Sequence, residues 1–131
     1  MRKLLGRTAI QKIDPPSLEG EILQDADRLD AIGAIGLARA FSVGGSENRS
    51  LYNPVDPFCK SKRQLDNARW TLDHVESKLM VLKNSIHTRT AKKIADERTD
   101  FMKLFISQLR NEFYPLKDKM DIDICYNFQF Q

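Results

Sequence analysis

Three carboxylates stand close together, directly before a run that is almost wholly small and apolar. The stretch QDADRLDAIGAIGLARAF contains Asp25, Asp27 and Asp30. On a helix, Asp27 and Asp30 are three residues apart and project to one side, whereas Asp25 points away from Asp27. Carboxylate oxygens suit hard divalent cations, but a cation needs several converging ligands and two carboxylates are too few. The pattern is therefore compatible with a metal site or with a solvated, salt-bridged helix surface.

The apolar neighbours of these carboxylates favour a position near a hydrophobic core. Burial is expected for Leu29, Ile32, Ile35 and Leu37. Some of the three aspartates must then lie close to buried surface, where a carboxylate needs a metal or a cationic partner. Arg39 lies on the same apolar segment and could reach a phosphate or pair with one of the aspartates. We favour the pairing.

A second group of candidate residues lies in HVESKL. His74 and Lys78 are four residues apart, so on a helix they are neighbours and could present an imidazole and an ammonium group to a phosphate. The alternative is a helix-surface histidine packed beside Val75 and Glu76. His87 falls in a predicted connection between two helices, where we expect a structural role in the turn.

Composition and charge describe one ordinary domain. The chain has 131 residues, 41% of them hydrophobic and 30% charged, with a formal net charge of +3. Basic and acidic residues are interspersed, so charge gives no support to nucleic-acid binding. No apolar run approaches the roughly 18 residues that span a bilayer. Cys59 and Cys125 lie far apart without metal-ligand spacing, so we expect free thiols and a cytoplasmic location. For the start MRKLLGRTAIQK, an incidental basic segment is favoured over a mitochondrial presequence.

Helical periodicity is expected to position the carboxylates. Ser17 follows two prolines and is the expected N-cap of a first helix. The residues expected to share one face of this helix are Leu18, Ile22, Ala26 and Leu29. Gly33 and Gly36 predict a bend or a break, and hence two helices instead of one. Residues 42–58 are rich in Gly, Ser, Asn and Pro and predict a long loop.

Two long helices are predicted after this loop. In the first, over residues 65–82, the buried stripe is Leu65, Ala68, Leu72, Val75, Leu79 and Leu82. In the second, which Thr88 or Thr90 caps and Pro115 ends, the inward residues are Ala91, Ile94, Ala95, Phe101, Met102, Phe105, Ile106 and Leu109. The short connection 83–88 predicts that the two helices form an antiparallel pair.

The C-terminal segment, residues 120–131, has a different period. Apolar residues alternate with others in MDIDICYNFQFQ, which predicts a half-buried strand; the alternative is a frayed extension. A single strand needs a partner, and the same segment of another molecule would make the tail a dimerisation element. The predicted fold class is all-α, with a possible C-terminal β-strand.

The order of these motifs resembles the C-terminal half of small cytosolic HD-domain metal-dependent phosphohydrolases. The resemblance rests on PPSLEGEILQDADRLDAIGAIGLARAF, on GG and RSLYNP, and on LDHVESKLMVLKNSIHTRTAKKIADERTDFMKLFISQLRNE. It implies a partial helical bundle over residues 15–114, between an N-terminal segment 1–14 and a tail 115–131. It also implies hydrolysis of phosphate esters or anhydrides, often of nucleotides, by a water that a divalent metal such as Mn²⁺ or Mg²⁺ activates.

The resemblance also implies roles for particular residues. The family's metal-ligating Asp matches Asp27 in Ala26-Asp27-Arg28-Leu29. The implied catalytic residues are Asp27 and Asp30, and the implied substrate-binding residues are Arg39, His74 and Lys78. The implied substrate is a nucleotide or another phosphorylated small molecule.

The chain departs from the family in its histidines. The family's other ligands are a His and an adjacent His-Asp pair, but His74 and His87 are the two histidines of this chain, and neither is followed by Asp. We therefore expect either a truncated phosphohydrolase or a degenerate homologue. A truncated bundle should expose apolar surface and self-associate. The alternative function is a non-catalytic helical module whose hairpin, residues 65–109, is an interaction or dimerisation surface.

Overall fold

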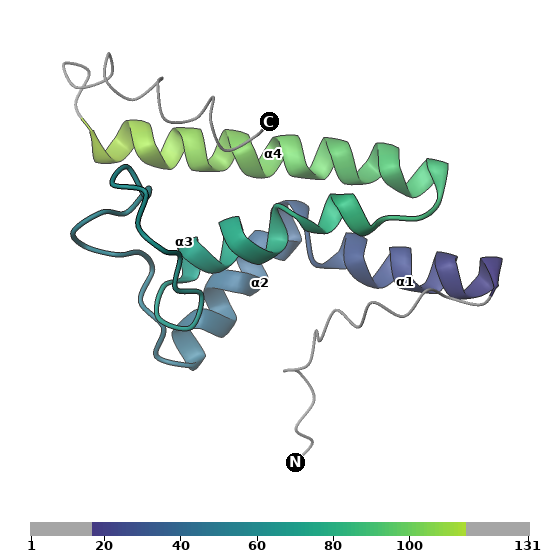
Figure 1. Cartoon of the computed structure of the whole chain (residues 1–131), viewed down its shortest axis with the longest axis horizontal. Coiled ribbons are helices and arrows are strands. Elements are labelled where there is room, and N and C mark those ends of the chain that lie inside the picture. The colour runs from purple at the N-terminus through teal and green to yellow at the C-terminus, as the bar shows by residue number, and fades with distance from the viewer. Residues whose placement is uncertain (1–16, 115–131) are drawn as a thin grey trace.

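The computed structural model describes residues 17–114, which form an all-α fold (Figure 1). Its elements are α1 (Leu18–Asp30), α2 (Gly33–Ser46), α3 (Thr71–His74), the π-helix η1 (Val75–Leu79), the 3-10 helix η2 (Leu82–Ser85) and α4 (Arg89–Phe113). No helix in this part of the chain is long and apolar enough to cross a membrane. The predicted strand at 120–131 and the basic start lie outside the described residues.

The start of α1 and the break after it agree with the sequence prediction. The Ser17 hydroxyl accepts a hydrogen bond from the backbone N–H of Gly20, so Ser17 is the N-cap. The break lies between Asp30 and Gly33. Gly33 has a φ of 82°, in the left-handed region that favours glycine. The chain therefore turns between α1 and α2 at the predicted place.

The predicted loop at 42–58 is wrong at both ends. α2 continues to Ser46, and the irregular segment runs from residue 47 to residue 70. Aromatic contacts hold this segment on the C-terminal end of α4: the rings of Tyr52 and Phe113 pack edge to face with centroids 4.6 Å apart. The long irregular segment is thus fixed against the helices.

For the helix predicted over residues 65–82, two points of the prediction are wrong: the starting residue and the regular α-helical form. It begins only at Thr71, becomes π-helical over η1 and ends as the 3-10 helix η2. Ahead of it, the Asp66 carboxylate accepts hydrogen bonds from the backbone N–H groups of Ala68 and Arg69. Hydrogen bonds from an aspartate side chain to nearby backbone N–H groups compete with helix formation, so a turn forms at these residues instead of a helix.

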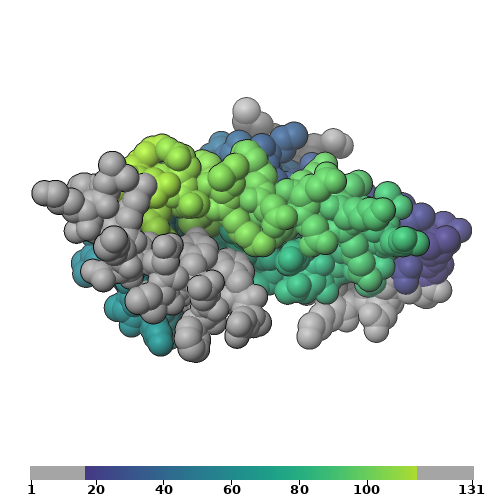
Figure 2. All heavy atoms as spheres, turned by 90° about the horizontal axis from the view of Figure 1, so that it is seen from above, coloured from purple at the N-terminus to yellow at the C-terminus, as the bar shows by residue number. Residues whose placement is uncertain are grey.

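α4 is the longest helix and lies across α1 and α2 (Figure 1). The Thr88 hydroxyl accepts a hydrogen bond from Ala91 N, so the predicted N-cap is confirmed. The teal segment from α3 to η2 runs in the opposite direction to α4, which confirms the antiparallel pair. In the view from above (Figure 2), α4 covers much of the face and α1 extends beyond its N-terminal end. The prediction that Phe101 faces inward is wrong, because its side chain is 44% exposed.

The core lies between these helices. Its buried apolar members include Ile32, Leu37, Phe58, Leu72, Val75, Leu79, Met80, Leu82, Ile86, Met102 and Ile106. Side chains from α2 and α4 meet at the edge of the core, where the rings of Phe41 and Phe105 have centroids 6.0 Å apart. The four apolar residues that the sequence places at 72, 75, 79 and 82 are all buried, although the helix that carries them is irregular.

Several large apolar side chains of α1 and α2 are exposed. The exposed fractions are 61% for Leu18, 54% for Ile22, 73% for Leu23 and 72% for Ile35. The expected burial of Ile35 is therefore wrong, whereas Ile32 and Leu37 are buried as predicted. Leu18 and Ile22, which were predicted to share one face of α1, are both exposed. Burial of large apolar side chains is favourable, so these exposed positions of α1 and α2 are suited to contact with further polypeptide.

Candidate functional site

Asp25 is the buried member of the three carboxylates, and its contacts are structural. It is 2% exposed, and its two oxygens accept hydrogen bonds from the backbone N–H groups of His87 and Thr88, each at 2.8 Å. Burial opposes ionisation, but these hydrogen bonds outweigh it and lower the pKa of the Asp25 carboxyl below its ordinary value. Because Thr88 is the N-cap of α4, the negative charge also lies where a helix dipole favours it. Asp25 therefore joins α1 to the start of α4.

Arg28 completes this junction. Its Nη1 donates to the Ser85 carbonyl oxygen at 2.7 Å and lies 2.8 Å from Nε2 of His87. The side-chain oxygen Oε1 of Gln24 lies 3.0 Å from the same nitrogen. The predicted turn role of His87 is confirmed, but sequence reasoning missed Arg28, because an arginine between two aspartates gives no sign of burial.

Asp30 and Arg39 form a pair on the outside of the molecule. Nη1 of Arg39 lies 2.6 Å from Oδ2 of Asp30, and Nη2 donates to the Asp30 carbonyl oxygen at 2.7 Å. The predicted pairing of Arg39 with one of the aspartates is thus confirmed. An exposed ion pair contributes little stability and costs little to open.

Asp27 is exposed, and it lies four residues after the exposed Leu23, on the same side of α1. Within residues 17–114, no three His, Cys, Asp or Glu side chains are grouped so that they could hold a metal ion. A divalent cation needs several ligands, and one carboxylate supplies too few. The described residues are therefore insufficient for the metal centre that the family resemblance implies, although Asp27 is accessible as one ligand of such a centre.

His74 and Lys78 form the second cluster of candidate residues, and the structure adds Arg49. His74 ends α3 and is half-buried, while Lys78 is exposed on the next turn. Burial, and then the positive charges of Arg49 and Lys78, lower the pKa of the His74 imidazole; Glu47 acts in the opposite direction. Nη2 of Arg49 lies 2.5 Å from Oε2 of Glu47, which holds the guanidinium in place. Positive groups around an imidazole are suited to receive an anionic group.

The structure thus divides the candidate residues into two groups. The first is Asp27, Asp30 and Arg39 on α1 and α2, and the second is His74, Lys78 and Arg49. α2 connects them: it carries Arg39, it packs against α3 and η1, and Arg49 follows its C-terminal end. Sequence reasoning missed Arg49 because it falls in the predicted loop, where spacing gives no indication of neighbours.

The comparisons with known proteins agree with this fold. No family model matches the chain. The uncharacterized protein YpgQ of Bacillus subtilis (strain 168) is 39% identical over 99 residues, which are 76% of this chain and 42% of YpgQ. A crystal structure of an HD-superfamily hydrolase from Bacillus thuringiensis has 41% identity and a TM-score of 0.62, with 74% of this chain and 47% of that chain covered. The crystal structure of YpgQ in complex with ADP has 40% identity and a TM-score of 0.61, over 73% and 44% of the two chains.

These similarities support the HD-domain assignment, and the described residues have an all-α, HD-like fold. The chain spans less than half the length of YpgQ and of the Bacillus thuringiensis hydrolase. More than half of each relative therefore has no counterpart in the matched region.

Proposed function

We propose that this chain contributes one part of a metal-dependent phosphohydrolase site that acts on nucleotides or other phosphorylated small molecules. In this proposal Asp27 is a metal ligand, Asp27 and Asp30 are catalytic, and Arg39, His74 and Lys78 bind substrate. The similarity to an HD-superfamily hydrolase supports the class of reaction. The crystal structure of YpgQ with ADP supports a nucleotide as the substrate class.

The observation that carries the proposal is the position of Asp27. Its carboxylate is exposed beside the exposed Leu23, on a side of α1 where apolar side chains lack cover within the described residues. Polypeptide that packed on Leu23 would also approach Asp27. We propose that the missing ligands come from polypeptide that corresponds to the unmatched portion of the relatives. That polypeptide could be continuous with this chain or separate from it.

The positive side chains would divide the recognition of a phosphate between them. Arg39 would offer a planar pair of N–H donors after leaving Asp30, and Lys78 would offer a compact positive charge from the surface. His74, whose pKa is lowered, would be neutral near pH 7 and would act through a hydrogen bond.

The first test concerns the metal. By itself the chain is expected to bind Mn²⁺ weakly or not at all, and to hydrolyse nucleotides at a rate near background, because affinity requires several converging ligands. Isothermal titration of the chain with Mn²⁺ measures this. Micromolar binding that disappears in Asp27→Ala would show instead that residues of this chain suffice for the site.

The second test is complementation. The chain is mixed with the portion of YpgQ that it does not match, expressed separately, and Mn²⁺-dependent hydrolysis of a nucleoside diphosphate is measured. The mixture should be active, Asp27→Asn should remove the activity, and Glu97→Gln, which changes an exposed carboxylate of α4, should retain it. Formation of a complex without turnover would contradict the catalytic proposal.

The non-catalytic alternative places an interaction surface on the hairpin of residues 65–109. The apolar stripe that suggested this surface is buried inside the chain, since Leu72, Val75 and Met102 are at most 1% exposed. The exposed side of α1 and α2 is therefore the better surface for association, and it is the one that adjoins Asp27.

A further inference from the structure

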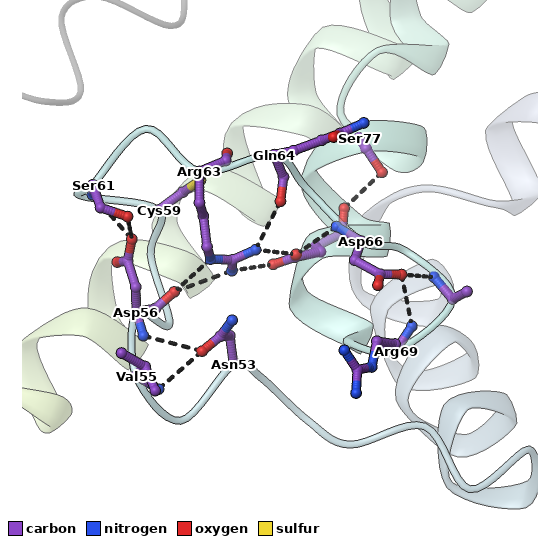
Figure 3. A network of polar contacts seen from close by, with 12 residues as sticks. Asn53, Val55, Asp56, Cys59, Ser61, Arg63, Gln64, Asp66, Arg69 and Ser77 are labelled. Carbon is purple, nitrogen blue, oxygen red and sulfur yellow. Dashed lines mark hydrogen bonds and ion pairs between the residues drawn. The ribbon is translucent and has the colours of Figure 1, made fainter.

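Arg63 joins the irregular segment to α3 (Figure 3). Its Nη1 and Nη2 donate to the two carboxylate oxygens of Asp73 at 2.6 and 2.7 Å, and its Nε and Nη2 donate to the Asp56 carbonyl oxygen at 3.1 and 3.0 Å. Asp73 is 1% exposed, and its Oδ2 also accepts a hydrogen bond from the backbone N–H of Asp66 at 2.8 Å. Residues of the irregular segment therefore hold both oxygens of a buried carboxylate of α3.

The backbone around Arg63 is fixed by further hydrogen bonds. The Asp56 carboxylate accepts hydrogen bonds from Ser61 N and Oγ at 2.9 and 2.5 Å. The buried Cys59 thiol donates to the Arg63 carbonyl oxygen at 3.0 Å. A guanidinium that contacts a carboxylate with two N–H groups fixes the orientation of that carboxylate as well as its position. Arg63 can therefore transmit a defined orientation to Asp73.

α3 depends on such outside contacts for its orientation. It has four residues, Thr71–His74, and continues directly into the π-helix η1. One turn of helix has too few internal hydrogen bonds to be stable alone, so contacts with the rest of the fold decide its rotation about its own axis. Asp73 and His74 are adjacent in this turn. The rotation that brings Asp73 onto Arg63 therefore also sets the direction of the His74 imidazole.

We propose that Arg63 is a positioning residue for the substrate-binding group formed by His74 and Lys78. It acts through Asp73: the ion pair fixes the rotation of α3, and α3 leads into η1, which carries Lys78. Replacement of a buried ion pair by apolar residues often leaves stability unchanged, so we assign this pair to geometry and not to stability. This role of Arg63 rests on the proposed function of His74 and Lys78 in substrate binding.

Proton NMR titration of the two histidines of the full chain tests the role of Arg63. The charged groups that act on the His74 imidazole are Arg49, Lys78 and Glu47. Burial, and then the two positive charges, hold the His74 pKa below its ordinary value of 6.5. Arg63→Lys keeps the positive charge but loses the two-pronged contact, so α3 should rotate, His74 should become more exposed, and its pKa should rise toward 6.5. His87, at the junction of α1 and α4, is the internal reference, and its signals should be the same in both chains.

A paired substitution covers the case in which a single change unfolds the chain. Arg63→Met with Asp73→Leu leaves no unpaired buried carboxylate, but it removes the contact that orients α3. The His74 pKa should rise toward 6.5 in this chain as well, with urea unfolding as the check that it is folded. Lys93→Arg changes an exposed residue of α4 and should titrate like the parent chain. An unchanged His74 pKa in Arg63→Lys, or in the paired variant where only that chain folds, would overturn the proposal.

Phosphate binding distinguishes a failure of this role from a failure of the proposed function. Inorganic phosphate, with sodium chloride of equal ionic strength as the control, should shift the His74 signals of the parent chain. Its affinity should fall about tenfold in Arg63→Lys, because loss of one hydrogen bond to a charged group corresponds to about that factor. If phosphate leaves the His74 signals of the parent chain unchanged, the proposed substrate role of His74 fails, and the titration alone decides whether Arg63 positions the imidazole. Equal phosphate binding by the parent chain and Arg63→Lys would contradict the positioning role.

Discussion

At the scale of the residue, burial assigns different tasks to side chains of the same chemical type. Asp25 and Asp27 are two positions apart, yet Asp25 accepts two backbone hydrogen bonds inside the molecule, whereas Asp27 faces outward. The same holds for the arginines: Arg28 is buried at the helix junction, and Arg39 lies in an exposed pair. The exposed members are the ones available to a ligand.

Replacing Asp25 tests its structural role. Asp25→Asn keeps one carbonyl oxygen but loses the charge and the second acceptor, so the free energy of unfolding should fall by about 1–3 kcal/mol at pH 7. The pKa of Asp25 is lowered from its ordinary value of 3.8, so its contribution is present above that value and is lost as the pH falls through the lower folded pKa. Urea unfolding measures both effects. Asp27→Asn is the matched control and should unfold like the parent chain.

Replacing Glu76 should change the pH dependence of global stability. Burial, and then the negative charge of Asp73, raise the pKa of Glu76 from 4.5 to about 7, so the folded chain binds more protons than the unfolded chain between these values. The free energy of unfolding of the parent chain should therefore fall as the pH rises through this window. Glu76→Gln should remove this component and be more stable than the parent at pH 8 by about 1 kcal/mol or more, since one pKa unit corresponds to about 1.4 kcal/mol. Equal stability of the two chains at pH 8 would show that ionised Glu76 is well accommodated.

At the scale of the element, close approach of the backbone decides how the helices join. Gly36 is buried, and a methyl group at its position would overlap the Ala31 carbonyl oxygen in the turn between α1 and α2. Further along α2, a methyl group on Gly45 would meet no atom within 4 Å. The turn between α1 and α2 therefore requires glycine at position 36, whereas position 45 has room for a larger residue.

A pair of glycine substitutions separates these cases. Gly36→Ala should lower the free energy of unfolding by about 2 kcal/mol or more, because backbone must move to relieve the overlap. Gly45→Ala should leave stability unchanged or raise it by up to about 1 kcal/mol, because alanine favours the helix. Thermal unfolding followed by circular dichroism compares the two variants. A Gly36→Ala chain as stable as the parent would mean that the turn adjusts freely.

At the scale of the whole molecule, the helices bury one side of α1 and α2 and leave the other side exposed. α4 covers both helices from one direction, while Leu23 and Ile35 remain more than 70% exposed. An apolar surface of this kind favours association in water. The proposed docking of further polypeptide and the expected self-association of the chain have this common physical origin.

Substitution of the two exposed residues should reduce self-association. The parent chain is expected to form oligomers and to bind a hydrophobic dye, and Leu23→Ser with Ile35→Ser should reduce both without lowering the free energy of unfolding by more than about 0.5 kcal/mol. Sedimentation velocity and dye fluorescence measure the change. Leu104→Ser, which alters an exposed leucine of α4, should have little effect. A monomeric parent chain that binds no dye would contradict the expectation.

The sequence by itself determined the features that depend on neighbours along the chain. Ser17 and Thr88 cap helices because their hydroxyls bond backbone groups three residues ahead, and the glycine at position 33 separates two helices because of its own backbone freedom. The periodic residues of α4 other than Phe101, and the four buried positions from 72 to 82, were predictable for the same reason. Family resemblance, carried by a continuous string of residues, added the proposal that Asp27 is a metal ligand.

Only the tertiary structure decided which charged residues are buried and what they contact. Asp25 meets Thr88, and Arg63 meets Asp73, across separations that no local pattern encodes. The start of α3 at Thr71 also depended on long-range contacts, since Ser50 and Trp70 form a bridge immediately before it. Local preference sets the range of structures that a segment can adopt, but burial of charge depends on groups that folding brings together from distant parts of the chain.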